Sequence, residues 1–349
     1  MIISRTPYRV SFFGGGTDYP QWYLKEGGAV LSTTIDKYCY ITCRVLPPFF
    51  ETRYRIIWSH IENVSTISEI LHPAVREGLK HLGINGDFGG LEIHYQGDLP
   101  ARAGMGSSSS FVVGLFKVLS ALKGEIVGSH ELASMAIEFE QSILKENVGS
   151  QDQVAVSYGG MNVIRFRKNG EIRVEPVTIS SEKLSELESS LMLLYTGTSR
   201  LSSEIAADFV ANCETKGTVL KKMRTMVDQA LSILAGQGSI SEFGTLLDET
   251  WKLKRGISKK ISSPTIDKIY VTAIENGALG GKLLGAGSSG FMLLFAPPER
   301  QQQIKDALPG YLHVPFKFES EGSTIIYYSR SDQVEYEILR QHSLRSRMP

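Results

Sequence analysis

The stretch Pro100-Ala101-Arg102-Ala103-Gly104-Met105-Gly106-Ser107-Ser108-Ser109-Ser110 decides how the fold of this chain is interpreted. It precedes apolar residues at helical spacing, Phe111, Leu115, Leu119 and Leu122. Glycine lets a ligand approach the backbone closely, and serine is a good helix N-cap. A helix that begins here would direct its free N–H groups and its positive dipole end at one point, which suits a phosphate. The serine hydroxyls could add hydrogen bonds or a metal ligand. The alternative is an ordinary flexible loop before a core helix.

Length and composition set the class of protein. The chain has 349 residues, 42% of them hydrophobic, which is enough for a substantial core and about two domains. It contains 37 basic and 37 acidic residues, and this balance argues against a nucleic-acid-binding surface, which needs a basic excess. The residues after Met1 include no apolar stretch long enough for a signal peptide or a membrane span. We therefore expect a soluble cytoplasmic protein without a membrane partner.

The cysteines support the same compartment. Cys39, Cys43 and Cys213 form no CxxC pair, which fits a reducing environment and offers neither a disulfide framework nor a zinc cluster. Cys39 and Cys43 lie in an apolar run, so we expect them to be buried thiols.

The first half of the chain mixes predicted strands with predicted helices. Its β-branched and aromatic runs predict strands at Tyr8–Phe13, Cys39–Leu46, Arg53–Trp58, Leu91–Gln96 and Met161–Phe166. Apolar periodicity predicts helices at Phe111–Lys123, closed by Gly124, and at Leu132–Lys145. The chain becomes polar and charged around Ser180–Ser190, so we expect one domain at residues 1–185 and a second at 186–349.

The second half continues the α+β pattern. A strand is predicted at Leu191–Thr196, followed by helices over Val219–Leu234 and Phe243–Trp251. Ser263-Pro264 suits the start of a further helix, which Gly277 can end. Later strands are predicted at Lys282–Leu284, Phe291–Phe295, Tyr311–Phe316 and Thr324–Ser329. The last twenty residues are polar and are either a helix or a loose tail.

Two further glycine-rich segments stand out. In Pro7–Tyr19 a strand runs into Gly14, Gly15 and Gly16 and then Thr17-Asp18. Asp18 could accept hydrogen bonds from substrate hydroxyls, or it could cap a tight turn. Gly285–Gly290 matches GxGxxG, but a strand-like run follows it where a dinucleotide-binding motif needs a helix. We interpret it as a glycine-rich turn between two strands.

Two carboxylates are candidates for chemistry. Glu140 borders the apolar face of its predicted helix and could point toward a ligand or toward water. Asp152 follows it by twelve residues, after a Gly149-Ser150 turn, and a turn cap is its alternative role. No Walker A pattern, GxxxxGK[ST], occurs in the chain, so any ATP site must have another architecture.

The order and spacing of Pro7–Tyr19, Pro100–Ser110 and Lys282–Leu294 resemble the three motifs of the GHMP kinases, and the resemblance covers essentially the whole chain. It implies a two-domain α+β fold with the ATP site between the domains, and a phosphate loop at a helix N-terminus. ATP and Mg²⁺ are the implied cofactors. A homo-oligomer stays open.

The resemblance also implies roles for particular residues. Asp152 would be the catalytic base or orienting carboxylate, and Arg9 would lie near the attacking hydroxyl and the moving phosphoryl group. Ser108 and Glu140 would bind Mg²⁺. The nucleotide phosphates would contact Gly104, Met105, Gly106, Ser107, Ser108 and Ser109. The sugar substrate would contact Gly14, Gly15, Gly16, Thr17, Asp18, Gly285, Ala286 and Gly287. Ser150-Gln151 departs from galactokinase, which has hydrophobic residues there, and this puts the role of Asp152 in doubt.

Within the superfamily, the chain is most similar to bacterial kinases of D-glycero-D-manno-heptose 7-phosphate. The carriers of this resemblance are Phe13–Tyr19, with its glycine triplet, and Leu194–Arg200. It implies phosphorylation of the anomeric 1-hydroxyl to a 1,7-bisphosphate for lipopolysaccharide, capsule or S-layer glycan. The alternatives are a kinase of fucose or of unphosphorylated heptose, and a non-catalytic sensor. A phosphorylated substrate needs a second anion site, for which the candidates are Arg102, Arg200, Lys252, Lys254 and Arg255.

Overall fold

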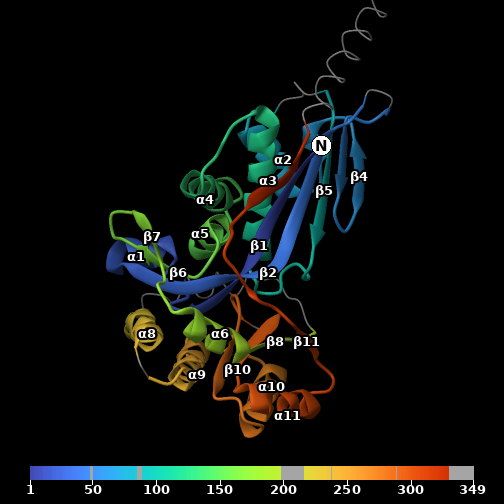
Figure 1. Cartoon of the computed structure of the whole chain (residues 1–349). Coiled ribbons are helices and arrows are strands. Elements are labelled where there is room, and N and C mark those ends of the chain that lie inside the picture. The colour runs from blue at the N-terminus through green and yellow to red at the C-terminus, as the bar shows by residue number, and fades with distance from the viewer. Residues whose placement is uncertain (48–49, 85–88, 198–215, 237, 288, 330–349) are drawn as a thin grey trace, which may run out of the picture.

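A computed structural model describes residues 1–47, 50–84, 89–197, 216–236, 238–287 and 289–329. Arg200, Cys213, Ser288 and the last twenty residues lie outside these ranges. The centre of the molecule is a nine-stranded sheet with the strand order β13-β1-β2-β5-β3-β4 along its main path (Figure 1). Its long central strands are β1 (Ile2–Phe13) and β2 (Gly28–Val45), which pair antiparallel.

The remaining strands of this sheet flank the central pair. The strand β5 (Leu91–Gly97) pairs with β2, and β3 (Tyr54–Ile57) and β4 (Ile61–Val64) extend that edge. The strand β6 (Asn162–Phe166) pairs with the first part of β2, and β7 (Ile172–Pro176) pairs with β6. Short elements η1 (Ile67–Glu69) and α1 (Pro20–Glu26) lie in the connections between strands.

A layer of helices covers one face of β1 and β2. The central one, α3 (Ser107–Lys123), packs on both strands, and α2 (Pro73–His81) packs beside it. This close approach uses Gly114, where a Cβ would lie 2.9 Å from the Thr6 hydroxyl oxygen. The layer continues with α4 (Ser129–Glu138), a π-helical turn η2 (Phe139–Ile143) and α5 (Gln151–Tyr158).

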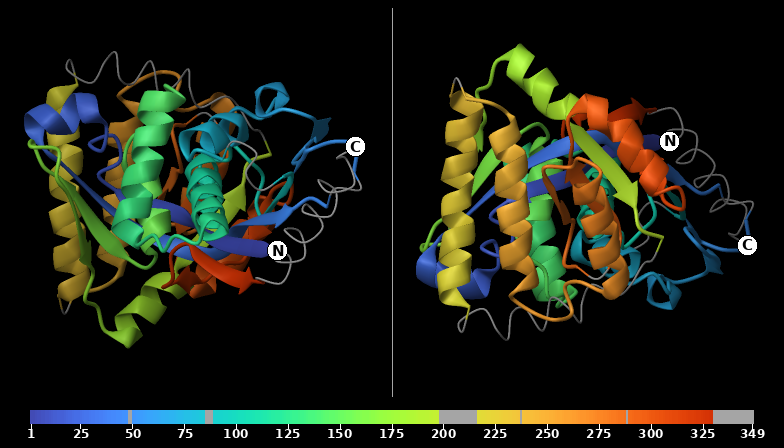
Figure 2. Two further views of the ribbon diagram at one scale, coloured as in Figure 1. Left: turned by 90° about the horizontal axis from the view of Figure 1, so that it is seen from above. Right: turned by 90° about the horizontal axis from the view of Figure 1, so that it is seen from below.

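The second half of the chain covers the other side. After α6 (Ser181–Ser189) come the helices α8 (Gly217–Ala235) and α9 (Ser241–Arg255), which contact β1 and lie side by side when seen from below (Figure 2). A second sheet has the order β11-β8-β10-β9. Its strands are β8 (Leu191–Tyr195), β9 (Gly280–Leu283), β10 (Phe291–Phe295) and β11 (Leu312–Val314), and its helices are α10 (Pro264–Glu275) and α11 (Pro298–Ala307).

The end of the described chain returns to the first sheet. The strand β12 (Phe318–Glu319) pairs with β2, and β13 (Thr324–Tyr328) runs antiparallel along β1 (Figure 1). A division at residues 185/186 remains a prediction, and any such division would have to assign these two strands to the N-terminal half.

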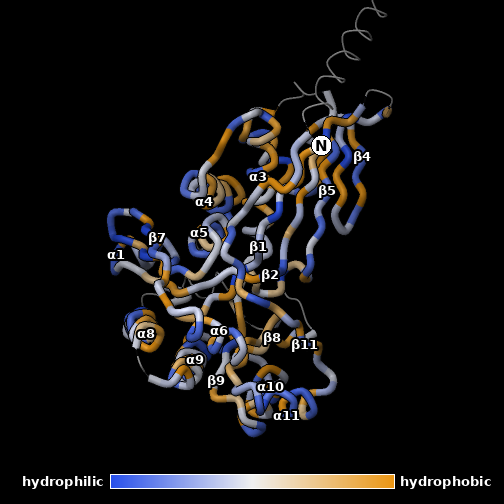
Figure 3. The backbone as a smooth tube through the Cα atoms, in the orientation of Figure 1, coloured by the Kyte–Doolittle hydropathy of each residue, from blue (hydrophilic) through white to orange (hydrophobic). Residues whose placement is uncertain are grey.

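One core joins both halves. The rings of Phe12 and Phe13 on β1 contact Phe243 on α9 with centroids 5.3 and 4.9 Å apart, and Phe243 in turn lies 6.4 Å from Phe295 on β10. These side chains belong to a single cluster of buried residues, and Figure 3 shows hydrophobic segments running through both halves. Cys39 and Cys43 are buried thiols, as predicted. Among the described residues, no helix has the length and apolar character needed to cross a membrane.

Most predicted strands and helices are confirmed, with β2 much longer than predicted. The helix predicted over Leu132–Lys145 is wrong in one respect, since it ends at Glu138 and continues as the π turn η2. The helices α1, α2, α5, α6 and α11 were missed, and so were the strands β4, β7 and β12. Such short elements contain few repeating apolar positions.

Candidate active site

The serine-rich stretch forms a loop that opens α3. Helix α3 begins at Ser107, four residues earlier than predicted, and Gly106 takes the N-cap position with φ +74°. Gly104 also has a positive φ, +80°. L side chains rarely adopt this backbone region, so glycine is favoured at both turns. The first N–H groups of α3 have no intrahelical acceptor, which is the arrangement that suits an anion, and phosphate binding by this loop stays a prediction.

The glycine-rich turn of the second half packs directly on this loop. A Cβ at Gly104 would lie 2.5 Å from the Leu284 carbonyl oxygen, and a Cβ at Gly285 would lie 2.4 Å from the Gly104 Cα. The Phe291 N–H donates to the Ala103 carbonyl at 3.2 Å. The strand β10 follows the turn directly, as expected, so the dinucleotide-binding interpretation fails in the structure too. Segments about 180 residues apart in the sequence thus form one surface.

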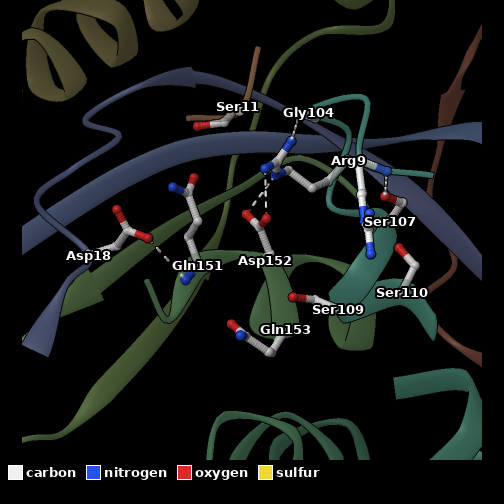
Figure 4. Close-up of polar contacts among 12 residues, drawn as sticks. Arg9, Ser11, Asp18, Gly104, Ser107, Ser109, Ser110, Gln151, Asp152 and Gln153 are labelled. Atoms are coloured by element: carbon white, nitrogen blue, oxygen red, sulfur yellow. Dashed lines mark hydrogen bonds and ion pairs between the residues drawn. The ribbon is translucent and has the colours of Figure 1, made fainter. Parts of the chain in front are cut away.

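Arg9 connects the first strand, the loop and helix α5. Its Nε and Nη2 each donate to one carboxylate oxygen of Asp152 at 2.7 Å, and its Nη1 donates to the Gly104 carbonyl at 2.7 Å (Figure 4). The Arg9 side chain is only 4% exposed, whereas that of Asp152 is 24% exposed. A planar guanidinium is suited to this two-point pairing, which fixes both groups. Asp152 therefore lies beside the loop that opens α3 and is still accessible to a ligand.

The glycine triplet shapes the neighbouring wall. A Cβ at Gly14 would lie 1.9 Å from the Ala29 carbonyl oxygen, so the turn packs against the start of β2. Asp18 is buried and accepts a hydrogen bond from the Gly16 N–H at 2.8 Å. Burial and the nearby charge of Asp152 raise the pKa of the Asp18 carboxyl. The turn-capping role is therefore present, beside Asp152.

Two polar atoms beside the triplet are buried without a partner. The atoms nearest to a Cβ at Gly15 are Ser11 Oγ at 3.7 Å and Gln151 Nε2 at 3.8 Å. Within the described residues, Ser11 Oγ and Gln151 Oε1 have no hydrogen-bond partner. Buried polar groups are normally satisfied, so these two are candidates for contacts with ligand hydroxyls. Figure 4 shows Ser11, Asp18 and Gln151 around the same space as Asp152.

Glu140 lies in the π turn η2 and is fully buried. Its Oε2 accepts hydrogen bonds from the Ser109 hydroxyl at 2.8 Å and from the Gln153 amide, whereas its Oε1 has no partner among the described residues. Burial raises the pKa of Glu140 to about 8. A buried carboxylate with an unused oxygen suits a cation or a proton. Mg²⁺ prefers oxygen ligands and needs only one or two carboxylates, so the donor set fits this ion.

The serine that contacts Glu140 is Ser109, whereas Ser108 was the serine predicted to bind Mg²⁺ together with Glu140. The hydroxyl that reaches Glu140 is that of Ser109, while Ser108 is exposed in the first turn of α3. The Ser107 hydroxyl accepts a hydrogen bond from the Arg102 N–H at 3.0 Å. The pairing of Ser108 with Glu140 as metal ligands stays a prediction. Within the described ranges, no group of three or more His, Cys, Asp or Glu side chains is arranged so that it could hold a metal ion.

Four polar residues of the site were not predicted from the sequence. These are Ser11, Gln151, Gln153 and Lys282. Gln151 and Gln153 flank Asp152 in the sequence, and this adjacency to a candidate catalytic residue could have identified them as site residues. Lys282 is buried and donates to the carbonyls of Ser11 at 2.9 Å and Phe12 at 2.8 Å, a contact over about 270 residues that no local pattern reveals.

Comparison with known proteins identifies the family. The model for the GHMP kinases N terminal domain matches residues 69–160, and the model for the GHMP kinases C terminal matches residues 229–313. These ranges contain the loop, Glu140, Asp152 and the glycine-rich turn. The two matches therefore cover both of the glycine-rich segments that pack on each other.

Individual relatives agree with this. A D-glycero-alpha-D-manno-heptose 7-phosphate kinase of Campylobacter jejuni is 29% identical over 92% of this chain and 97% of its own length. A bifunctional fucokinase/GDP-fucose pyrophosphorylase of Arabidopsis thaliana is 26% identical over 86% of this chain, which covers 30% of that longer protein. The crystal structure of a D-glycero-D-manno-heptose 1-phosphate kinase of Bacteroides thetaiotaomicron has the same fold, with a TM-score of 0.76 at 24% identity over 94% of this chain and all of its own. The chain therefore belongs to the GHMP kinase family and is a phosphotransferase of the sugar kinase type.

Proposed function

We propose that the protein is an ATP- and Mg²⁺-dependent kinase that phosphorylates the anomeric 1-hydroxyl of D-glycero-D-manno-heptose 7-phosphate. The observation that carries the proposal is the position of Arg9, which joins the phosphate loop to Asp152 through one side chain. The likeness to the Campylobacter jejuni kinase supports the choice of sugar. The product would be a 1,7-bisphosphate, a precursor of bacterial surface glycan.

The reaction needs positioning and charge stabilisation more than covalent chemistry. The sugar hydroxyl gives its proton to Asp152, and its oxygen forms the bond to the γ-phosphorus as the bond to the leaving ADP breaks. Each Asp152 oxygen accepts one hydrogen bond from Arg9 and retains a lone pair for this proton. An anomeric hydroxyl is more acidic than an ordinary alcohol, so a carboxylate suffices as the base. Arg9 stabilises the charge that develops on the moving phosphoryl group.

The other residues bind and orient. The N–H groups of the loop and of the first turn of α3 hold phosphate oxygens, while Asp18, Ser11 and Gln151 contact sugar hydroxyls. Glu140, with a serine hydroxyl of the same turn of α3, would hold Mg²⁺. The ion, when bound, neutralises charge on the nucleotide phosphates.

Release of ADP with a panel of sugars tests the proposal. The panel holds D-glycero-D-manno-heptose as the 7-phosphate, as the 1-phosphate and without phosphate, together with fucose, galactose and mannose. We expect turnover with the 7-phosphate to exceed that of every other sugar by at least about tenfold. The 1-phosphate blocks the anomeric hydroxyl, so its turnover would assign another attacking hydroxyl. Preference for fucose would support the fucokinase alternative instead.

Absence of turnover with every sugar, together with tight ATP binding, would favour the non-catalytic sensor. The four residues Arg9, Ser108, Glu140 and Asp152 argue against a sensor, because a sensor has no need to keep all four.

A further inference from the structure

Three cationic side chains gather where the two halves of the chain meet. Arg9 comes from β1, Lys254 from the last turn of α9, and Lys282 from β9. The Lys254 ammonium donates to the carbonyls of Leu283 at 2.9 Å and Gly285 at 2.6 Å, inside the glycine-rich turn that packs on the phosphate loop. Lys254 is thus connected through Gly285 and Gly104 to the guanidinium of Arg9.

Compensating negative charge is scarce at this place. Among the described residues, Asp152 pairs with Arg9, and neither Lys254 nor Lys282 forms an ion pair with a carboxylate. An ammonium has three protons to donate, and Lys254 uses two of them on carbonyls. Lys254 is half-buried, whereas Lys282 is only 3% exposed. Lys254 therefore has a free proton, and as a residue it is more exposed than Lys282.

The other predicted candidates for a second anion site are less suitable. Lys252 donates to Asp248 at 2.6 Å, and Arg255 pairs with Asp267 at 2.9 Å, at a cavity of about 410 Å³ that both line. Their charge is already compensated by these carboxylates. Arg102 is exposed in the loop, and Arg200 lies outside the described residues.

We propose that the Lys254 ammonium binds a phosphate oxygen of a substrate, beside Arg9 and at the junction of the two glycine-rich loops. The inference rests on the proposed kinase function and adds the residue that recognises the anion. The phosphate belongs either to the nucleotide or to the sugar phosphate, and the two sources give different kinetic results.

The electrostatics agree with this geometry. Burial, and then the charge of Arg9, lower the pKa of Lys254 to about 7. Burial, Lys254 and Arg9 lower the pKa of Lys282 as well, while Asp18 raises it. A phosphate dianion beside Lys254 would favour its charged form and offset the repulsion among these cations.

The test compares Lys254→Met with Lys254→Arg and with Lys268→Met, a matched change at an exposed lysine on α10. The loss of a hydrogen bond to a charged group predicts a 10- to 100-fold effect, roughly, for Lys254→Met. If the sugar phosphate is bound, its KM rises by this factor and the Kd of Mg-ATP stays unchanged. If the nucleotide is bound, the Kd of Mg-ATP, titrated calorimetrically without sugar, rises instead. We expect Lys268→Met to change neither.

A pH profile separates anion binding from a merely structural clamp. Wild-type kcat/KM should fall as pH rises through about 7, where free-enzyme Lys254 loses its proton. Lys254→Arg should restore most of the activity and remove this fall, because arginine stays charged. A structural clamp would lower kcat/KM of Lys254→Met equally at every pH.

The outcomes are separable from those of the proposed function. If the wild type prefers another sugar of the panel, the variant-to-wild-type ratios of KM for that sugar and of Kd for Mg-ATP are measured instead. The proposed sugar can then be wrong while the proposed role of Lys254 is correct. Unchanged KM and Kd values in a folded Lys254→Met protein, or a loss that is independent of pH and not restored by arginine, would overturn the inference.

Discussion

At the scale of single residues, the pairing of Asp152 with Arg9 makes the first prediction. Asp152→Asn keeps the shape of the side chain but removes its charge and its capacity to take a proton. General-base catalysis contributes roughly 10²- to 10⁴-fold, so turnover should fall by at least about 10²-fold. The measurement is steady-state ADP release at saturating substrates.

The matched control is Asp228→Asn, which changes an exposed aspartate that also pairs with an arginine, Arg165, at 3.2 Å. An exposed pair contributes little, so this variant should retain wild-type turnover. Turnover of Asp152→Asn within about threefold of the wild type would remove Asp152 from the role of base.

Glu140 makes a prediction about pH. Burial raises its pKa from 4.5 in the unfolded chain to about 8, so the folded protein binds a proton more tightly than the unfolded chain does. This contribution to stability is fully present below about pH 4.5 and is lost as pH rises through about 8. Glu140→Gln cannot ionise and should therefore have a higher Tm than the wild type above about pH 8 without Mg²⁺.

Addition of Mg²⁺ provides the control for this variant. An ion that binds the ionised carboxylate should raise the wild-type Tm at high pH more than it raises that of Glu140→Gln. Equal pH dependence of Tm in the two proteins, measured by thermal unfolding from about pH 5 to about pH 9, would show that Glu140 does not titrate in this range.

At the scale of elements, the contact between the two glycine-rich loops carries the site. Gly104→Ala would place a Cβ 2.5 Å from the Leu284 carbonyl at a φ of +80°. The loop must then move away from the turn, and its N–H groups with it. We expect the Kd of ATP to rise at least about tenfold, measured by calorimetric titration.

Gly124→Ala separates backbone strain from this contact. Gly124 has nearly the same φ, +79°, but no atom lies within 4 Å of its Cβ position. Its strain should cost about 1–2 kcal/mol of stability without weakening ATP binding. If the two variants bind ATP equally well, the contact between the loops is unnecessary for the nucleotide site.

The elements also show how much of the site the sequence could predict. Local signals suffice for α3 and for the order of the three motifs, because glycine, serine and apolar spacing act within one turn or helix. Local signals could not reveal that Ser109 rather than Ser108 contacts Glu140, because this contact depends on the π-helical geometry of η2, which positions Glu140. The Lys254 and Lys282 contacts were equally hidden, because both are made to carbonyls, which every residue carries.

At the scale of the whole molecule, β12 and β13 belong to the first sheet although they lie near the end of the described chain, so the predicted boundary at 185/186 would have to assign them to the N-terminal half. Composition marks where the chain becomes polar, but strand pairing over about 320 residues leaves no local signal. The Thr6 and Ser323 hydroxyls, 2.8 Å apart and buried, fix this return. The two halves thus share a sheet as well as a core.

This shared core predicts cooperative unfolding. Phe243 is fully buried and contacts rings from β1 and β10, so Phe243→Ala removes contacts of both halves at once. A buried Phe→Ala change costs about 3–5 kcal/mol. In calorimetry we expect one transition in the wild type, and in Phe243→Ala one transition at lower temperature, because both halves contribute to this core. The active site lies at the junction that the core supports. Two transitions, of which the substitution shifts only one, would mean that the halves unfold independently, and the site would then depend on docking of two preformed units.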